Sequence, residues 1–105
     1  MDARKYACKV IWSEEDQEFA GLCAEFPSLT WLDKDQVRAF TGIVALVAGV
    51  LEDMLANGEQ MPVPLSERHF SGKIMVRTTP DVHRRLAMEA AEAGESLNRF
   101  INALL

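Results

Sequence analysis

The last 35 residues of the chain predict one strand followed by two short helices, and such a set cannot enclose a core by itself. Residues 71–78 alternate in character, so the predicted strand has two different faces. One face holds Ile74, Val76 and Thr78, and the other holds Lys73, Met75 and Arg77. A lone strand leaves both backbone edges without partners, which is costly when they are buried. Two copies remove this cost if their strands pair antiparallel and four helices close over the apolar face, so the sequence predicts a homodimer.

Both predicted helices have clear start signals. Thr79, Pro80 and Asp81 supply a hydroxyl cap, a proline in the first turn and an acid near the positive end of the helix dipole. The stripe of this helix consists of Val82, Leu86, Ala90 and Ala93, and Gly94 ends it. Ser96 caps the second helix. Its apolar residues are Leu97, Phe100, Ile101, Leu104 and Leu105.

The order of these signals resembles the Arc/MetJ ribbon-helix-helix family of DNA-binding proteins. The resemblance rests on the run 73–77, on Pro80 and on the run 94–98. It implies that the outward strand residues contact bases in the major groove, which a two-stranded ribbon fits. Those base-reading residues are Lys73, Met75 and Arg77. It also implies that the start of the second helix holds a DNA phosphate, as helix starts commonly do, through Ser96, Leu97 and Asn98. Met75 departs from the polar residue usual at the middle position, and its side chain suits a thymine methyl group.

The front of the chain predicts three strands and a long helix. Two alternating runs, 5–13 and 18–26, flank the charged turn 14–17 and predict a β-hairpin, and residues 28–32 predict a third strand. A helix capped by Asp33 is expected to run to about Asn57, with Gly58 as its stop. Its predicted core face consists of Val37, Phe40, Val44, Val47, Leu51 and Leu55. A second stripe of Ile43, Leu46, Val50 and Met54 is expected to contact another chain, because one sheet covers only one side.

The fold class expected from these elements is α+β, in two domains. Residues 61–64 contain two prolines and predict a stiff, extended exit, which we place with residues 65–70 in a linker. The expected domains are residues 1–66 and residues 67–105. Residues 1–66 carry five Lys/Arg and eleven Asp/Glu, whereas residues 67–105 carry six and five, so the front is acidic and the back slightly basic. Such an asymmetry indicates two modules with different partners.

Composition excludes several other classes of protein. Two cysteines, Cys8 and Cys23, are too few for a disulfide framework or a four-ligand zinc site, and we interpret them as small buried apolar residues. The start of the chain has no pattern of a signal peptide, and the apolar run 39–51 is shorter than a membrane span, so we expect a cytoplasmic protein. The acids show no spacing suited to metal-dependent catalysis. We interpret Glu25, Asp33, Asp35 and the hairpin acids as solvated surface, and expect no enzyme, no metal and no cofactor.

Taken whole, the chain resembles the HicB antitoxins that carry a ribbon-helix-helix tail. The resemblance rests on the paired runs 6–12 and 19–23, the run 24–29, the long helix, the exit 62–64 and the junction 70–73. It implies a partial RNase H-like β-β-β-α fold in front. It also implies a partner, a small basic HicA toxin that cleaves mRNA, and repression of the chain's own operon. The segment 31–35 departs from the turn that many of these proteins have before the helix. The alternative is a free-standing ribbon-helix-helix regulator with no cognate toxin.

Overall fold

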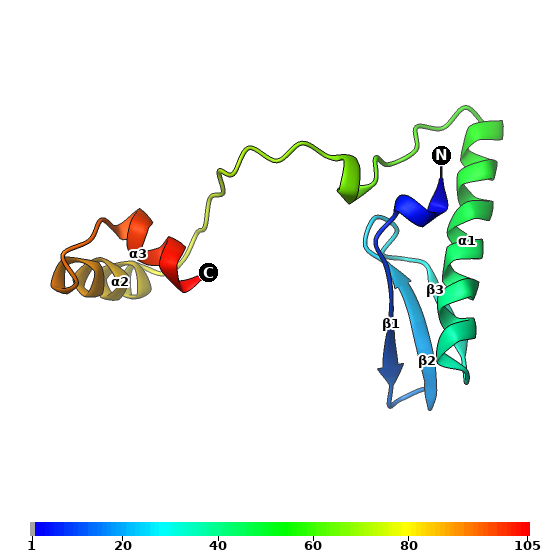
Figure 1. Ribbon diagram of the computed structural model, residues 1–105, viewed down its shortest axis with the longest axis horizontal. Coiled ribbons are helices and arrows are strands. Elements are labelled where there is room, and N and C mark those ends of the chain that lie inside the picture. Colours follow the sequence, from blue (N-terminus) through cyan, green and yellow to red (C-terminus); the bar gives the residue numbers. More distant parts are fainter. Residues whose placement is uncertain (1) are drawn as a thin grey trace. The chain divides into compact units, whose positions relative to one another are not determined.

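The computed structural model describes residues 2–105, which form two compact units, one ending at Phe70 and the other spanning Ser71–Leu105. The first unit contains a three-stranded sheet and one long helix, and the second contains two shorter helices (Figure 1). The expected α+β class is confirmed. The boundary between the units lies four residues beyond residue 66, where the sequence placed it.

The sheet is antiparallel, with the strands in chain order β1 (Cys8–Ser13), β2 (Glu18–Cys23) and β3 (Thr30–Asp33). The predicted hairpin is confirmed, and its turn is held by a hydrogen bond from Ser13 Oγ to Asp16 Oδ2 at 2.8 Å. The third strand begins two residues later than predicted. Cys8 lies opposite Cys23, and Trp12 lies opposite Phe19, with their rings 5.0 Å apart.

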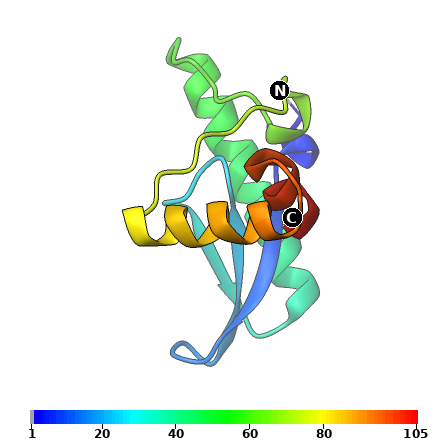
Figure 2. The same ribbon diagram turned by 90° about the vertical axis from the view of Figure 1, so that its left-hand side faces the viewer.

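Helix α1 (Gln36–Ala56) lies across one face of this sheet as a second layer (Figures 1 and 2). Its cap is Asp35, whose Oδ1 accepts from the Val37 N–H at 3.1 Å, and not Asp33 as predicted. Asp33 ends β3 instead and accepts from the Asp35 N–H, so it fixes the turn before the helix. The helix ends as expected, with Gly58 at a φ of +69°, where a residue with a side chain is disfavoured.

The face that α1 turns to the sheet matches the predicted one only in part, because Val47 and Leu51 are buried as predicted but Ala39 and Ile43 are buried with them. The fully buried residues are Ala39, Ile43, Val47 and Leu51. Val37 and Leu55, predicted for the core, are 69 % and 65 % exposed, and Phe40 is nearly half exposed. The prediction that this second stripe meets another chain is wrong for Ile43, which is completely buried within its own unit. For Leu46, Val50 and Met54, which are partly buried, it stays a prediction. The buried face thus combines residues of both predicted stripes, and β2 helps to set its position. Gly21 has no side chain, so Ala39 and Ile43 approach it closely.

By length and composition α1 could cross a membrane, since it is 21 residues long and strongly apolar. The run 39–51 was judged too short for a span, but the helix that contains it is not. The same helix packs against the sheet through four buried residues. A core helix of this length passes the same test, so the observation carries no weight for a membrane role.

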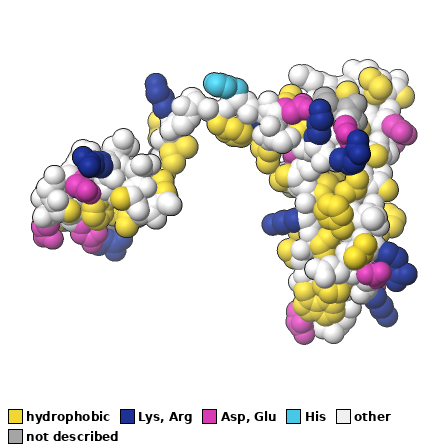
Figure 3. Space-filling view, in the orientation of Figure 1, with side chains coloured by type: hydrophobic (Ala, Val, Ile, Leu, Met, Phe, Trp, Pro, Cys, Tyr) yellow, Lys and Arg dark blue, Asp and Glu magenta, His cyan; other side chains and the backbone are white. Residues whose placement is uncertain are grey.

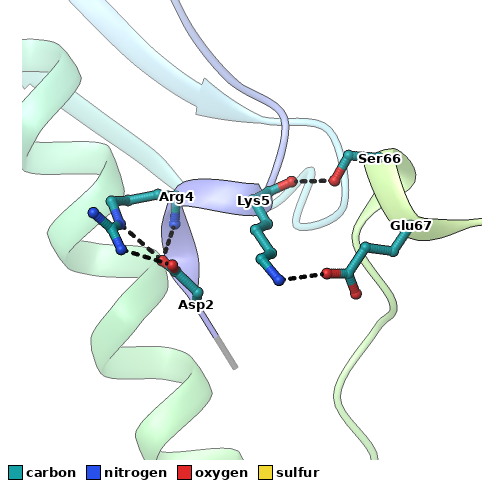
Figure 4. Close-up of polar contacts among 5 residues, drawn as sticks. All are labelled: Asp2, Arg4, Lys5, Ser66 and Glu67. Atoms are coloured by element: carbon teal, nitrogen blue, oxygen red, sulfur yellow. Dashed lines mark hydrogen bonds and ion pairs between the residues drawn. The ribbon is translucent and has the colours of Figure 1, made fainter.

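The segment after α1 returns to the first unit and docks against the start of the chain. The 3-10 helix η2 (Leu65–Glu67) lies beside the 3-10 helix η1 (Ala3–Lys5). Ser66 Oγ donates to the Lys5 carbonyl at 2.9 Å, and Lys5 Nζ pairs with Glu67 at 2.9 Å (Figure 4). Residues 65–67, interpreted as linker, are therefore part of the first unit.

The second unit consists of the segment 71–79, α2 (Pro80–Glu92) and α3 (Leu97–Leu104). The predicted helix starts are confirmed: Thr79 Oγ1 accepts from the Val82 N–H and Ser96 Oγ accepts from the Arg99 N–H. Gly94, between the helices, has a φ of +70°. Residues 73–79 form no strand in the single chain. A strand needs a neighbour for its backbone hydrogen bonds, and none of the other described residues pairs with this segment.

Candidate nucleic-acid interface

The segment 71–79 is the most exposed apolar stretch in the second unit. Ile74, Met75 and Val76 have 78 %, 81 % and 76 % of their surface exposed. The segment begins at Gly72, whose φ of +82° is one that residues with side chains rarely adopt. Near its start the Lys73 N–H donates to Ser71 Oγ, a local bond within the segment. Large apolar side chains at this exposure indicate a surface that another molecule covers.

The three residues predicted to read bases, Lys73, Met75 and Arg77, lie on this segment and are all exposed. Among residues 2–105, neither Lys73 nor Arg77 takes part in an ion pair. Their charges are therefore available to an anionic partner.

Beside the segment lies a shallow apolar groove with a volume of about 350 Å³. Residues of the segment form one wall, and residues of α2 and α3 form the other. The lining residues are Val76, Thr78, Thr79, Pro80, His83, Leu86, Leu97 and Ile101. Most of these carry the apolar patterns that the sequence assigned to the core of a dimer. His83, in the first turn of α2, also lines the groove.

The start of α3 holds the predicted phosphate-binding residues. Ser96 is the cap, and the first backbone bond of the helix runs from the Phe100 N–H to the Ser96 carbonyl at 2.9 Å. The N–H groups of Leu97 and Asn98 precede that bond, so the helix itself gives them no acceptor. Together with the helix dipole, these groups favour an anion at this end.

The acids of the first unit have structural roles that the sequence did not reveal in full. Glu14, in the hairpin turn, accepts from Trp12 Nε1 at 2.7 Å. Hydrogen bonds from Trp12 and Gln17 lower the pKa of Glu14. Within residues 2–105, no group of three or more His, Cys, Asp or Glu side chains is placed to hold a metal ion.

Glu25 is the residue that the sequence interpretation missed, because it was assigned to solvated surface. Its Oε2 accepts from the Leu65 N–H at 2.8 Å, and its Oε1 accepts from the Ala7 N–H at 3.0 Å and from Cys23 Sγ at 3.4 Å. Partial burial raises the pKa of Glu25, but the hydrogen bonds from the Leu65 and Ala7 N–H groups more than offset it, so the pKa is lowered. One carboxylate thus joins the start of the chain, the end of β2 and the exit segment. These partners are up to 40 residues away, and no local sequence pattern indicates them.

Comparison with known proteins bears on the second half of the chain. Neither the curated proteins nor the solved structures contain a match. The family model described as the HicB family matches residues 55–105, from the last turn of α1 through the exit segment and the whole second unit. This match supports a HicB-like antitoxin.

Proposed function

We propose that this chain is the antitoxin of a HicAB-type toxin-antitoxin system and represses its own operon by binding DNA as a dimer. The observation that carries the proposal is the second unit, where an exposed, unpaired apolar segment lies beside an apolar groove. The family match covers this same region. The proposed activity is binding in the cytoplasm without catalysis.

In the proposed dimer, the segments 71–78 of two chains pair as a two-stranded ribbon. Pairing gives each backbone the hydrogen bonds that the single chain lacks, and it turns Ile74 and Val76 toward the helices. Burial of one such side chain stabilises the dimer by about 1.5–3 kcal/mol. Two exposed residues in each of two chains then contribute several kcal/mol, which supports folding of this unit as an obligate dimer.

The opposite face of the ribbon is then free to enter the DNA major groove. Lys73, Met75 and Arg77 project from this face in the proposed complex. Arginine suits guanine best, because its planar fork matches the O6 and N7 acceptors. The amides of Leu97 and Asn98 at the α3 start hold a backbone phosphate and fix the ribbon on the duplex.

The first unit is proposed to neutralise the toxin. Residues 1–66 have a net charge of −6, which complements a small basic protein. The β-β-β-α order is compatible with the partial RNase H-like fold that the family resemblance implies. Toxin neutralisation and DNA binding then lie in separate units, so a substitution in one unit should affect one activity and leave the other unchanged.

Arg77→Ala tests the proposal, with Arg4→Ala as a control that removes an equal charge from the first unit. A lost bidentate contact weakens binding by about 1–3 kcal/mol, and the dimer presents the residue twice, so operator affinity should fall at least tenfold. Ser96→Ala should weaken binding to all DNA sequences alike. Gel-shift titrations at fixed salt measure both effects, and a growth assay measures toxin rescue, which both variants should retain. Normal operator binding by Arg77→Ala would contradict the proposed reading element.

A free-standing regulator is the second candidate. The family match leaves the sheet and most of α1 unmatched, which favours the DNA-binding half over the toxin-binding half. A short basic reading frame beside this gene favours the antitoxin. A purified first unit that binds the product of that frame would decide between the two.

A further inference from the structure

The outer edge of β1 in the first unit is open, and its side chains are apolar on both faces. The strand order β1-β2-β3 leaves β1 paired on one side only. Ile11 and Trp12 point to opposite faces, and each has nearly half of its surface exposed. Open edges of this kind are usually shortened, bulged or heavily charged, and here Lys9 is the only charge in the strand.

The hydrogen-bond pattern fixes which backbone groups the open edge presents. The Ala24 N–H donates to the Ala7 carbonyl, so Ala7 and Ala24 occupy a hydrogen-bonded pair. Such pairs alternate along an antiparallel ladder, so Lys9 and Ile11 bond to β2. The N–H and C=O groups of Val10 and Trp12 therefore point outward, to the open edge.

The apolar surface continues from β1 onto α1. Trp31 of β3 lies against Gly42, whereas Ala39 and Ile43 lie over Gly21 of β2. Successive residues of a helix are about 100° apart, so the exposed Val37 and Phe40 lie on the opposite side of the helix from Gly42. Because Gly42 lies on the β3 side, Val37 and Phe40 lie on the β1 side. Figure 3 shows hydrophobic side chains gathered along the face of the first unit where β1 and α1 lie.

We propose that β1 is a homodimer interface, in which the β1 strands of two chains pair antiparallel into one six-stranded sheet. The occupant is a second copy because the strand complements itself. Its start carries Lys9, and its end leads into Glu14, Glu15 and Asp16, so antiparallel pairing sets the cationic end of one copy beside the acidic end of the other. Its exposed apolar residues lie on both faces, so pairing with a second copy would cover apolar surface on both sides of the sheet. This interface is independent of the DNA-binding dimer proposed above.

The register follows from the same pattern. If the symmetric pair were centred on position 9, the Lys9 side chains of the two copies would lie opposite each other, which is unfavourable. Centring it on Ile11 pairs the whole run from Lys9 to Ser13, with Val10 opposite Trp12 of the second copy and Lys9 opposite its Ser13. The two copies of Ile11 then form a non-hydrogen-bonded pair, with Cα atoms about 4.5 Å apart. That separation is within the range that a disulfide spans.

Disulfide trapping in the full-length chain tests the proposal. Ile11→Cys should cross-link rapidly between chains under mild oxidation, with peptide mapping placing the link at position 11. Leu32→Cys is the matched control, because Leu32 lies in the same cross-strand row and is similarly exposed, but on the opposite edge. Cross-linking of Ile11→Cys no faster than that of Leu32→Cys would overturn the proposal.

Val10→Pro provides a second test that leaves the fold intact. The Val10 N–H points outward, so proline removes a donor from the open edge and no bond between β1 and β2. Sedimentation should show half as many copies per particle as in the unmodified chain. Leu32→Pro, at an outward position of β3, should leave the particle unchanged. A Val10→Pro chain with native tryptophan fluorescence and an unchanged particle mass would refute the interface, whatever the DNA-binding unit does.

Discussion

Removing the charge of Glu25 should release the exit segment from the first unit. The carboxylate is the acceptor for two backbone N–H groups that belong to distant parts of the chain, Leu65 and Ala7. Glu25→Gln keeps the size of the side chain but replaces one acceptor oxygen with an NH₂ donor. If the NH₂ takes the place of Oε2, the Leu65 N–H faces a donor and loses its bond; if it takes the place of Oε1, the Ala7 N–H keeps only its longer contact of 3.2 Å to the other oxygen. In either case the bonds that remain are to a neutral oxygen.

The magnitude follows from the kind of bond that is lost. A hydrogen bond to a charged group contributes about 1.5–3 kcal/mol, and a neutral one about 0.5–1.5 kcal/mol. We therefore expect local opening to become easier by about 1–2 kcal/mol, which corresponds to an opening equilibrium about 5–30 times larger. Glu25→Ala removes both acceptors, so both N–H groups should lose protection.

Hydrogen exchange of the Leu65 and Ala7 amides measures this effect directly. Glu14→Gln is the control, because it removes a carboxylate that also accepts hydrogen bonds, but only within the hairpin. It should leave both amides unchanged. If the protection factors of both amides in Glu25→Ala stay within a factor of two of those in the native chain, the carboxylate does not hold the exit segment.

Acid should have the same effect as the substitution. The pKa of Glu25 is lower in the folded chain than its ordinary value of 4.5. A carboxyl with a lowered pKa stabilises the fold above its unfolded pKa, and the contribution is lost as the pH falls through the folded value. Protection of Leu65, corrected for intrinsic exchange, should therefore be constant near neutral pH and decline below about pH 4.5 in the native chain. It should be flat with pH in Glu25→Gln.

Three further predictions concern packing, capping and thiol reactivity. A Cβ at Gly21 would lie 2.5 Å from the Ala39 carbonyl oxygen, so Gly21→Ala should destabilise the first unit by about 1–3 kcal/mol. Gly49 has open space around it, so Gly49→Ala should instead stabilise α1 by about 0.5–1 kcal/mol. Urea unfolding followed by tryptophan fluorescence reports on this unit alone, since Trp12 and Trp31 both lie in it, and equal shifts for the two variants would contradict the packing. Ser96→Ala should cost α3 about 0.5–2 kcal/mol by removing its cap, with a matching loss in the thermal stability of the second unit; an unchanged melting temperature would count against the cap. Burial, with Cys23 beside it, raises the pKa of Cys8 from 9.0 to about 11, so alkylation at pH 8 should be about a hundredfold slower than in urea, and equal rates would show an accessible thiol.

The sequence alone determined the local features of this protein. The hairpin, the caps at Thr79 and Ser96, and the helix stops at Gly58 and Gly94 depend on residues within about four positions of one another. Hydrogen bonds of that range are set by residue type, so the patterns predict them. The cysteines were also interpreted correctly, because Cys23 is buried and Cys8 is partly buried. Base reading by Lys73, Met75 and Arg77 remains a prediction, since the strand that would carry these residues does not form within residues 2–105 of the single chain.

Only the tertiary structure decided which face of α1 meets the sheet and where the exit segment goes. Two apolar stripes on α1 have the same helical spacing, and periodicity does not say that the buried face takes Val47 and Leu51 from one stripe and Ile43 from the other. The absent side chain of Gly21 contributes to this placement, because it lets Ala39 and Ile43 of the helix approach β2 closely. Likewise, Glu25 is an ordinary surface acid by composition and becomes a clamp only when Leu65 returns to it. Contacts between residues so far apart in the chain arise from the fold as a whole, and for this reason local patterns do not contain them.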